Sequence, residues 1–162
     1  MITKKEYQIL FNKYYSQMVY LANTYLFNKE DAEEIVQDVF IKIWNKRNEI
    51  QDFAIKTYLF TSTKNASINF LRRKKIDSQS LESLSKFKSQ NAKPLESLEF
   101  AQKIKKAIDQ LPPKTKRVFL MSRYFEFTYK EIAQILSLSP KTIENQMGTA
   151  LRLLKKKIFN EN

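Results

Sequence analysis

The sequence predicts an all-α protein made of two small helical domains joined by a flexible linker. Apolar residues recur at steps of three and four through most of the 162 residues, which is the pattern of amphipathic helices. The chain has a single Gly and four Pro, so few residues break this pattern. A Ser-rich stretch near the middle separates two periodic halves. We therefore expect domains at residues 1–75 and 96–162, with the linker at 76–95.

The first domain begins with two predicted helices. One covers residues 3–27, and Asn28 is expected to cap the second, because Asn is a favoured N-cap residue. The buried face of the first helix is predicted to contain Tyr7, Leu10, Phe11, Tyr14, Met18, Leu21 and Tyr25. The buried face of the second is predicted to contain Ala32, Ile35, Val36, Val39, Phe40 and Ile43.

Another face of this second helix is acidic and carries one aliphatic residue. It comprises Asp31, Glu34, Gln37, Asp38 and Ile41. The whole chain has a formal net charge of +12, so this acidic face is not suited to a polyanion. Spacing leaves two interpretations open, of which a solvated face is the simpler and a docking surface for a protein partner is the other.

Periodicity fails around residues 45–52, where we expect a loop before a long helix at 55–75. The predicted core stripe of that helix is Leu59, Ser62, Ala66 and Phe70. A different stripe contains Thr61, Asn65, Asn69 and Arg72, and the helix closes with the basic residues Arg73, Lys74 and Lys75. Amide side chains suit base edges and Arg suits phosphates or guanine. The alternative is that the basic residues only complement the helix C-terminus.

The second domain is predicted to be a four-helix unit. Its first helix ends before the Pro112-Pro113 pair, and its second begins within that pair. Thr128 followed by Glu131 is a capping box that starts the third helix. Ser139 is a suitable N-cap for the fourth, with Pro140 at the first helical position.

The last two helices follow the helix-turn-helix plan, in which the second helix lies in the DNA major groove. The inner face of the last helix is predicted to contain Ile143, Met147, Ala150, Leu151, Leu154 and Ile158. Its polar face contains Lys141, Glu144, Asn145, Gly148, Thr149 and Arg152. An ordinary helical hairpin in an all-α core is the alternative.

Composition narrows the possible functions. Lys and Arg number 29 against 17 Asp and Glu, which favours a nucleic-acid partner, although a basic surface can also serve solubility alone. The chain has no Cys and no His, so disulfides, thiolate metal sites and the usual general base are excluded. We expect neither an enzyme nor a cofactor, and no metal on the loose carboxylates Asp31, Glu34 and Asp38. The lack of a long apolar run or a signal-like start predicts a cytoplasmic protein without membrane insertion.

Four segments resemble a known family. AIDQLPPKTKRVFL (107–120) and YKEIAQILSLSPKTIEN (129–145) are similar to the promoter-binding C-terminal domain of sigma factors. The second of these is also similar to LuxR-type regulators, so a LuxR-like regulator is an alternative. DAEEIVQDVFIKIW (31–44) and TYLFTSTKNASINFLRRKK (57–75) are similar to the second domain of extracytoplasmic-function (ECF) sigma factors, in the same order. The resemblance covers nearly the whole chain outside the linker.

The resemblance implies a promoter-specificity subunit that binds core RNA polymerase and promoter DNA. The acidic face would dock on the β′ clamp helices, the C-terminal domain would lie at the β flap, and an anti-sigma factor would clasp both domains. The loop at 48–53 and the helix after it would meet the melted minus-ten element, where a base flips out of the duplex. The residues for that contact would be Thr61, Asn65, Asn69, Arg72 and Arg73.

The resemblance assigns the minus-thirty-five element to the last helix. Asn145, Gly148 and Thr149 would lie near base edges, and Glu144 could accept from cytosine N4. The phosphates would be contacted by Arg123, Ser139, Lys141, Thr142, Gln146 and Arg152.

The sequence departs from the family at Glu126 and Ser137, where similar sequences usually have Gly. Ser137 is expected in a left-handed conformation that costs about 1 kcal/mol, so the turn should survive. Besides the LuxR-like regulator, an RNA-binding or ribosome-associated protein and a nucleic-acid enzyme are alternatives, the last without an evident catalytic constellation.

Overall fold

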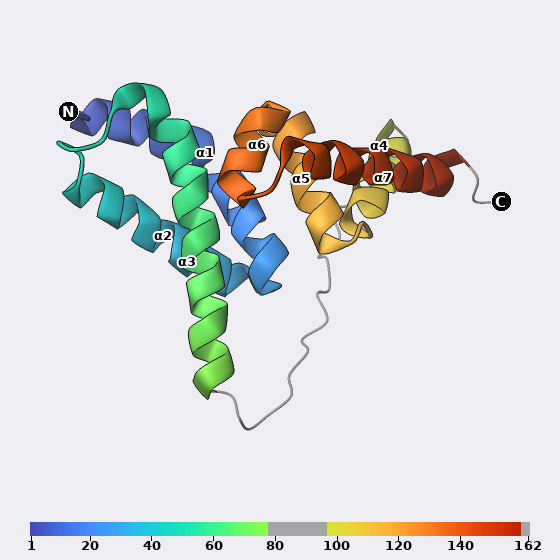
Figure 1. The fold of residues 1–162 in the computed structure, drawn as a ribbon, viewed down its shortest axis with the longest axis horizontal. Coiled ribbons are helices and arrows are strands. Elements are labelled where there is room, and N and C mark those ends of the chain that lie inside the picture. Colours follow the sequence, from blue (N-terminus) through green and yellow to red (C-terminus); the bar gives the residue numbers. More distant parts are fainter. Residues whose placement is uncertain (78–96, 160–162) are drawn as a thin grey trace. The chain divides into compact units, whose positions relative to one another are not determined.

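The computed structural model describes residues 1–77 and 97–159. Within these ranges it contains seven α-helices, one short 3-10 helix and no strand, so the all-α prediction is confirmed (Figure 1). The chain divides into two compact units, Met1–Phe87 and Lys88–Asn162, called here the N-terminal and C-terminal units. Most of the predicted linker, 76–95, lies outside the described residues. Its first two residues still belong to a helix, which ends at Asp77.

The N-terminal unit contains α1 (Lys4–Leu26), α2 (Lys29–Asn45), η1 (Asp52–Ala54) and α3 (Ile55–Asp77). The three long helices pack pairwise against one another (Figure 1). Asn28 caps α2 through its side chain, as predicted. All six residues predicted for the inner face of α2 are buried. Of the residues predicted for the inner face of α1, the structure buries Tyr14, Met18 and Leu21 and half-buries Tyr7, Leu10, Phe11 and Tyr25.

Aromatic rings join α1 to its two neighbours. Phe40 of α2 lies edge-on to Tyr7 with ring centroids 5.8 Å apart, and it also contacts Phe11 at 4.9 Å. Tyr14 lies edge-on to Phe60 of α3 at 6.1 Å. Edge-to-face pairs at such distances stabilise beyond the apolar area that they bury. The aromatic residues of α1 therefore serve the core, as the sequence indicated.

The buried face of α3 differs from the prediction. Leu59 is buried, but Ser62, Ala66 and Phe70 are only half-buried. The structure instead buries Phe60, Thr63, Lys64 and Ser67. The hydroxyl of Thr63 donates to the Leu59 carbonyl at 2.9 Å, and that of Ser67 donates to the Thr63 carbonyl at 2.8 Å. Because the helix itself satisfies these hydroxyls, they can face the core, and hydrophobic periodicity cannot find them.

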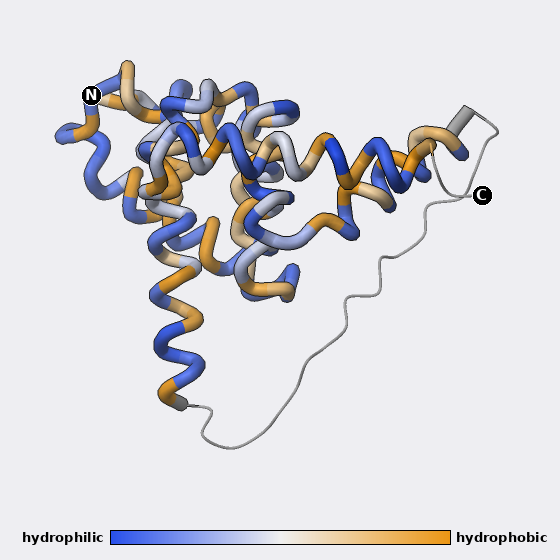
Figure 2. The backbone as a smooth tube through the Cα atoms, turned by 45° about the vertical axis from the view of Figure 1, so that its right-hand side comes forward, coloured by the Kyte–Doolittle hydropathy of each residue, from blue (hydrophilic) through white to orange (hydrophobic). Residues whose placement is uncertain are grey.

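The C-terminal unit contains α4 (Ser97–Asp109), α5 (Pro113–Arg123), α6 (Tyr129–Leu136) and α7 (Pro140–Phe159), which confirms the predicted four helices. α7 packs against the other three (Figure 1). Its buried residues are Ile143, Met147, Ala150 and Leu154. The prediction was wrong for Leu151, which is 44% exposed, while Ile158 is half-buried. Figure 2 shows hydrophobic and hydrophilic stretches alternating along the helices, as amphipathic packing requires.

Both ends of α6 are fixed by hydrogen bonds. At its start the predicted capping box is present, because the Thr128 N–H donates to the Glu131 carboxylate at 2.8 Å and the Glu131 N–H donates to the Thr128 hydroxyl at 3.2 Å. At its end Ser137 has a φ of 55°, which confirms the expected left-handed conformation. The Leu138 N–H then donates to the Ala133 carbonyl at 2.9 Å. These contacts form a Schellman motif, which sets the turn into α7.

Glu126 also has a positive φ, of 58°, so both positions at which similar sequences have Gly are left-handed here. A side chain in this conformation costs about 1–2 kcal/mol relative to the right-handed region.

We expect Ser137→Gly to raise the free energy of unfolding of the C-terminal unit by about 1 kcal/mol, because Gly adopts the left-handed conformation without a Cβ penalty. Hydrogen exchange of the α6 and α7 amides in the whole chain measures this free energy. The control is Gln134→Gly, at an exposed right-handed position three residues earlier, which should lower stability by about 1 kcal/mol. A loss of stability in Ser137→Gly would show that the serine side chain outweighs the backbone strain.

Candidate nucleic-acid interface

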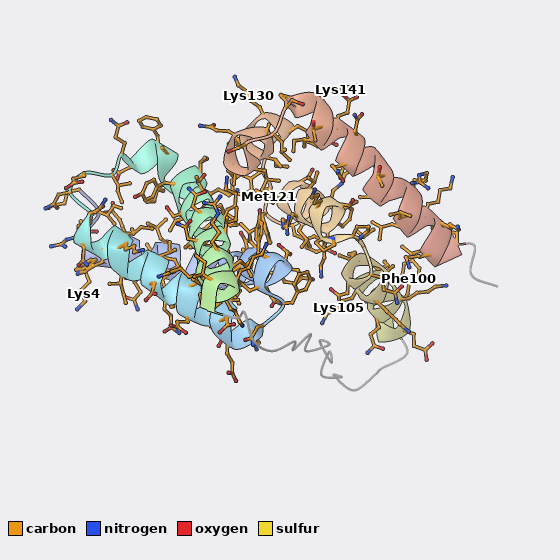
Figure 3. All side chains as sticks on the ribbon, turned by 60° about the horizontal axis from the view of Figure 1, so that its bottom comes forward. Lys4, Phe100, Lys105, Met121, Lys130 and Lys141 are labelled. Atoms are coloured by element: carbon orange, nitrogen blue, oxygen red, sulfur yellow. The ribbon has the colours of Figure 1, made fainter. Side chains whose placement is uncertain are left out.

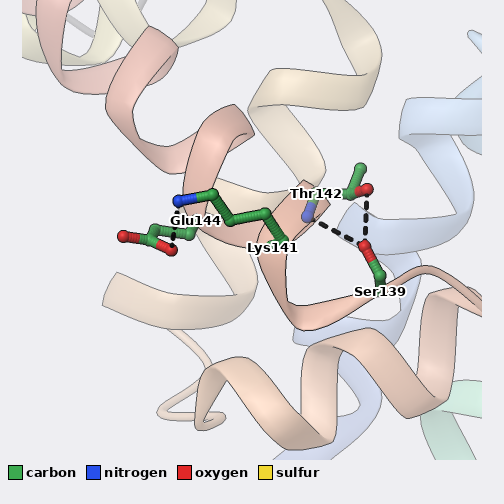
Figure 4. Close-up of polar contacts among 4 residues, drawn as sticks. All are labelled: Ser139, Lys141, Thr142 and Glu144. Carbon is green, nitrogen blue, oxygen red and sulfur yellow. Dashed lines mark hydrogen bonds and ion pairs between the residues drawn. The ribbon is translucent and has the colours of Figure 1, made fainter.

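The N-terminal end of α7 is held by a side-chain cap. The Thr142 N–H donates to the Ser139 hydroxyl at 3.1 Å, and the two hydroxyls are 2.9 Å apart (Figure 4). Lys141 donates to the Glu144 carboxylate at 3.2 Å, with both side chains mostly exposed. A surface ion pair of this kind is worth little, so either side chain can exchange its partner for a ligand. The Ser139 cap and the first turn of α7 thus form an ordered end that faces solvent.

One side of α7 is open to solvent along three turns. Lys141, Glu144, Asn145, Gly148 and Arg152 are exposed on it. Thr149 is half-buried, and its hydroxyl donates to the Asn145 carbonyl at 3.1 Å. The sequence-predicted residues of this helix therefore largely share one surface. In Figure 3, Lys141 of α7 and Lys130 of α6 both project away from the core, where Met121 is buried.

Gly148 has no packing role within the unit. A Cβ built on it would meet nothing within 4 Å apart from its own helix. Gly in the middle of a helix costs roughly 0.5–1 kcal/mol relative to Ala. The fold alone therefore does not explain this residue, whereas close approach of another molecule to the helix would.

Gln146 lies apart from the other predicted residues. It is half-buried, and its side-chain oxygen accepts a hydrogen bond from the hydroxyl of Thr115, a buried residue of α5, at 2.8 Å. This bond joins α7 to α5. Gln146 thus has a structural partner, unlike its exposed neighbour Asn145. Arg123, at the end of α5, is exposed.

The amide stripe of α3 is also a single exposed surface. Asn65, Asn69, Arg72 and Arg73 are exposed, and Thr61 is half-buried. Asn65 lies two positions after the buried Thr63, and Asn69 lies two positions after the buried Ser67. Two positions correspond to a rotation of about 200° around the helix axis, so both amides point away from the core. Near the end of the helix, Lys75 adds positive charge on this side, whereas Lys74 lies on the side of the buried hydroxyls and pairs with Asp31 of α2.

The acidic face of α2 is exposed at Glu34, Gln37, Asp38 and Ile41, of which Ile41 is 56% exposed. Asp31 differs, because its side chain is only 23% exposed and its carboxylate lies 3.4 Å from the Lys74 ammonium of α3. Asp31 therefore joins α2 to the basic end of α3 and contributes less to the open acidic face than the sequence suggested.

Phe53 was included in the sequence analysis only as the last residue of a loop, whereas the structure shows that its ring is almost fully exposed. It lies in η1 between α2 and α3, and it is 89% exposed. An aromatic ring in that position is a platform on which a base can stack. In the sequence, the only sign of this role was an aromatic residue in a segment that lacks helical periodicity and so has no core face for it.

Within residues 1–77 and 97–159 we find neither a cluster of metal-ligand side chains nor a helix that could span a membrane. No group of three or more carboxylates gathers there as metal ligands would. None of the helices in these ranges is long and apolar enough to cross a membrane.

Comparison with known proteins matches each unit to a family. Residues 10–76 match the family model described as Sigma-70 region 2, and residues 101–154 match the one described as Sigma-70, region 4. Both matches occur on one chain in that order.

Full-length relatives are similar as well. The RNA polymerase sigma factor SigV of Bacillus subtilis is 26% identical over 147 residues, covering 88% of this chain and 84% of SigV. The ferric citrate uptake sigma factor FecI of Escherichia coli is 27% identical over 125 residues, covering 75% of this chain and 72% of FecI. The ECF RNA polymerase sigma factor SigM of Bacillus subtilis is 22% identical over 151 residues, covering 92% of this chain and 90% of SigM.

Two solved structures share the fold. The sigma factor RpoE, solved with the anti-sigma factor NepR from Bartonella quintana, has a TM-score of 0.69 at 22% identity and covers 98% of this chain and 99% of its own. CnrH, solved with the cytosolic domain of CnrY, has a TM-score of 0.64 at 18% identity, and the match covers 99% of this chain and 92% of CnrH.

The different environments of Asn145 and Gln146 generate a prediction. Gln146→Ala should lower the free energy of unfolding of the C-terminal unit by about 1–3 kcal/mol, because it leaves the buried Thr115 hydroxyl without its acceptor. Asn145→Ala, the adjacent control, should change it by less than about 0.5 kcal/mol. Hydrogen exchange of the α5 and α7 amides reports both values. Equal effects of the two substitutions would remove the structural role of Gln146.

Proposed function

The chain belongs to the sigma-70 family of RNA polymerase sigma factors, in its ECF group, and we propose that its two units divide promoter recognition between them. The N-terminal unit would bind core polymerase and the minus-ten element, and the C-terminal unit the minus-thirty-five element. The observation that carries this proposal is the presence of both sigma-70 regions on one chain. The LuxR-like alternative is not supported, because the first half matches region 2 rather than an unrelated module.

The acidic face of α2 is the proposed polymerase-binding surface. Glu34, Gln37 and Asp38 surround an exposed Ile41, which combines charge for steering with an apolar contact. A solvated face remains the alternative interpretation. Membership of the family favours docking, because a sigma factor needs a protein surface for core polymerase as well as its DNA surfaces. The β′ clamp helices are the proposed acceptor there, and the β flap is the proposed contact of the C-terminal unit.

The minus-ten element would be bound by the stripe on α3 together with the connection before it. Asn65 and Asn69 offer amides to base edges, and Arg72 offers a guanidinium to phosphate or base. Phe53 would stack on an unpaired base, a contact worth roughly 1–3 kcal/mol. That gain is comparable with the few kcal/mol needed to unstack a base.

The minus-thirty-five element would be bound by α7. Asn145 and Gly148 lie on its open side, flanked by Lys141 and Arg152, which suit phosphates. The capped N-terminus at Ser139 favours a phosphate through its partial positive charge.

Regulation by a protein partner is a further part of the proposal. RpoE and CnrH were each solved with a second protein, NepR or the cytosolic domain of CnrY. We propose that this chain is likewise held by an anti-sigma factor in the cytoplasm, and that it performs no chemistry of its own. Recovery of the chain from cells only with core polymerase would contradict this part.

Run-off transcription tests the function directly. Purified protein is added to bacterial core RNA polymerase with a library of genomic promoter fragments, and discrete starts that require the protein are expected. Binding to duplex DNA without any association with polymerase would overturn the proposal.

Asp38→Arg should weaken binding to core polymerase by about 1–3 kcal/mol, because it reverses a charge at the centre of the proposed docking surface. Titration of labelled protein with core polymerase measures the affinity. The control is Glu99→Arg on α4, an exposed position outside the acidic face, where the charge change is identical and little effect is expected. Equal affinities for the two variants would exclude Asp38 from the docking surface.

Gly148→Ala should act in opposite directions on folding and binding. It should raise the free energy of unfolding of the C-terminal unit by roughly 0.5–1 kcal/mol, because Ala is the better helix former and its Cβ meets open space. It should weaken binding of the holoenzyme to the preferred upstream duplex by roughly 1–3 kcal/mol, since the methyl group faces the bases. A scrambled duplex is the control. Greater stability with unchanged affinity would show that α7 does not approach DNA at this residue.

A further inference from the structure

The residues in front of α1 are bonded to the connection between α2 and α3. The Ile2 N–H donates to the Arg47 carbonyl at 3.1 Å, and the Ile2 side chain is only 3% exposed. In Figure 1 the N-terminal end lies beside this connection. Two segments that are distant in the sequence therefore hold each other in place.

The N-terminal residues are themselves well ordered. Thr3 and Glu6 form a capping box, in which the Thr3 N–H donates to the Glu6 carboxylate at 2.8 Å and the Glu6 N–H donates to the Thr3 hydroxyl at 3.3 Å. The hydrogen bonds from Thr3 lower the pKa of Glu6. Ile2 and Tyr7 occupy the two positions of a hydrophobic staple around this cap, which fixes how the chain enters α1. The direction of Ile2 is thus set by the start of α1.

Arg47 is held from the other side by the end of α2. Its guanidinium lies over the Trp44 ring, 4.3 Å from the centroid, and donates to the Trp44 carbonyl at 2.8 Å. Trp44 packs edge-on against Tyr7 at 5.0 Å, and the Tyr7 hydroxyl donates to the Phe40 carbonyl at 3.0 Å. Ile2, Arg47, Trp44 and Tyr7 are thus linked in a continuous series of contacts that we call the N-terminal clamp.

Beyond the clamp the connection faces solvent. Asn48, Gln51 and Asp52 are exposed, and Phe53 has most of its surface free. The Glu49 N–H donates to the Lys46 carbonyl at 2.9 Å and the Ala54 N–H to the Gln51 carbonyl at 3.2 Å. These bonds are local and shape the connection without anchoring it to another helix. The Ile2–Arg47 bond ties it to α1.

We propose that the N-terminal clamp is a positioning element for minus-ten recognition, which holds the connection in the shape that presents Phe53 to an unpaired base. The inference rests on the proposed function of the N-terminal unit. A connection that had to become ordered on binding would lose affinity through the entropy of ordering. Because the clamp orders the connection when the protein folds, this entropy is lost before DNA binds and does not reduce the affinity for DNA.

The test uses holoenzyme assembled with Ile2→Ser and a fluorescent single-stranded minus-ten oligonucleotide from a promoter that the protein recognises. The oligonucleotide should bind about tenfold more weakly than to wild-type holoenzyme, a loss of about 1.4 kcal/mol. Affinity for core polymerase, which reports that α2 is folded, should not change. Ile2→Val should restore binding, and Ile9→Ser, at an exposed position of α1, is the matched control.

A double-mutant cycle with Phe53→Ala shows whether the clamp acts through the connection. The double variant should lose little more affinity for the oligonucleotide than Phe53→Ala alone, because the clamp has no effect on binding once the Phe53 ring that it positions has been removed. The proposal is overturned if Ile2→Ser binds the oligonucleotide normally, if the two losses add in full, or if core affinity falls in parallel. Should Ile2→Ser fail to fold, Arg47→Ala loosens the clamp from the other side by removing the guanidinium contacts with Trp44. If wild-type holoenzyme binds the minus-ten oligonucleotide no better than an oligonucleotide of unrelated sequence, the proposed function itself is refuted.

Discussion

The packing of α1 across both α2 and α3 is the constraint on which the N-terminal unit depends. α1 presents Tyr7 and Phe11 to Phe40 of α2 and Tyr14 to Phe60 of α3. Each of the other helices then has one covered side and one open side. The acidic face of α2 and the amide stripe of α3 are the open sides, so a single packing arrangement exposes both proposed binding surfaces.

Local signals were enough to predict much of the fold. The inner face of α2 was predicted in full because its apolar residues are strictly periodic, and the caps at Asn28 and Thr128 depend only on nearby residues. α3 was less predictable, because Thr63 and Ser67 are polar and yet buried against the core. Their hydroxyls are satisfied within the helix, and no pattern of apolar residues records this.

The candidate surfaces were predictable in outline but not in every member. The resemblance groups Gln146 with the phosphate contacts of the last helix, but only the structure shows that its oxygen accepts a hydrogen bond from Thr115 of another helix. Asp31 likewise belongs to the acidic face by spacing and to an ion pair with Lys74 by packing. Contacts between distant segments, such as that between Ile2 and Arg47, leave no local signal at all.

The division of the chain into two compact units has a consequence for how strongly each one needs to bind. Once one unit is attached to its partner, the other is confined near its own target at a high effective concentration. Two contacts of modest strength then give a long-lived complex, while either contact alone dissociates quickly. A factor built in this way holds firmly when both targets are correctly spaced and is released stepwise when one contact is lost. Weak individual surfaces are therefore compatible with both selectivity and turnover.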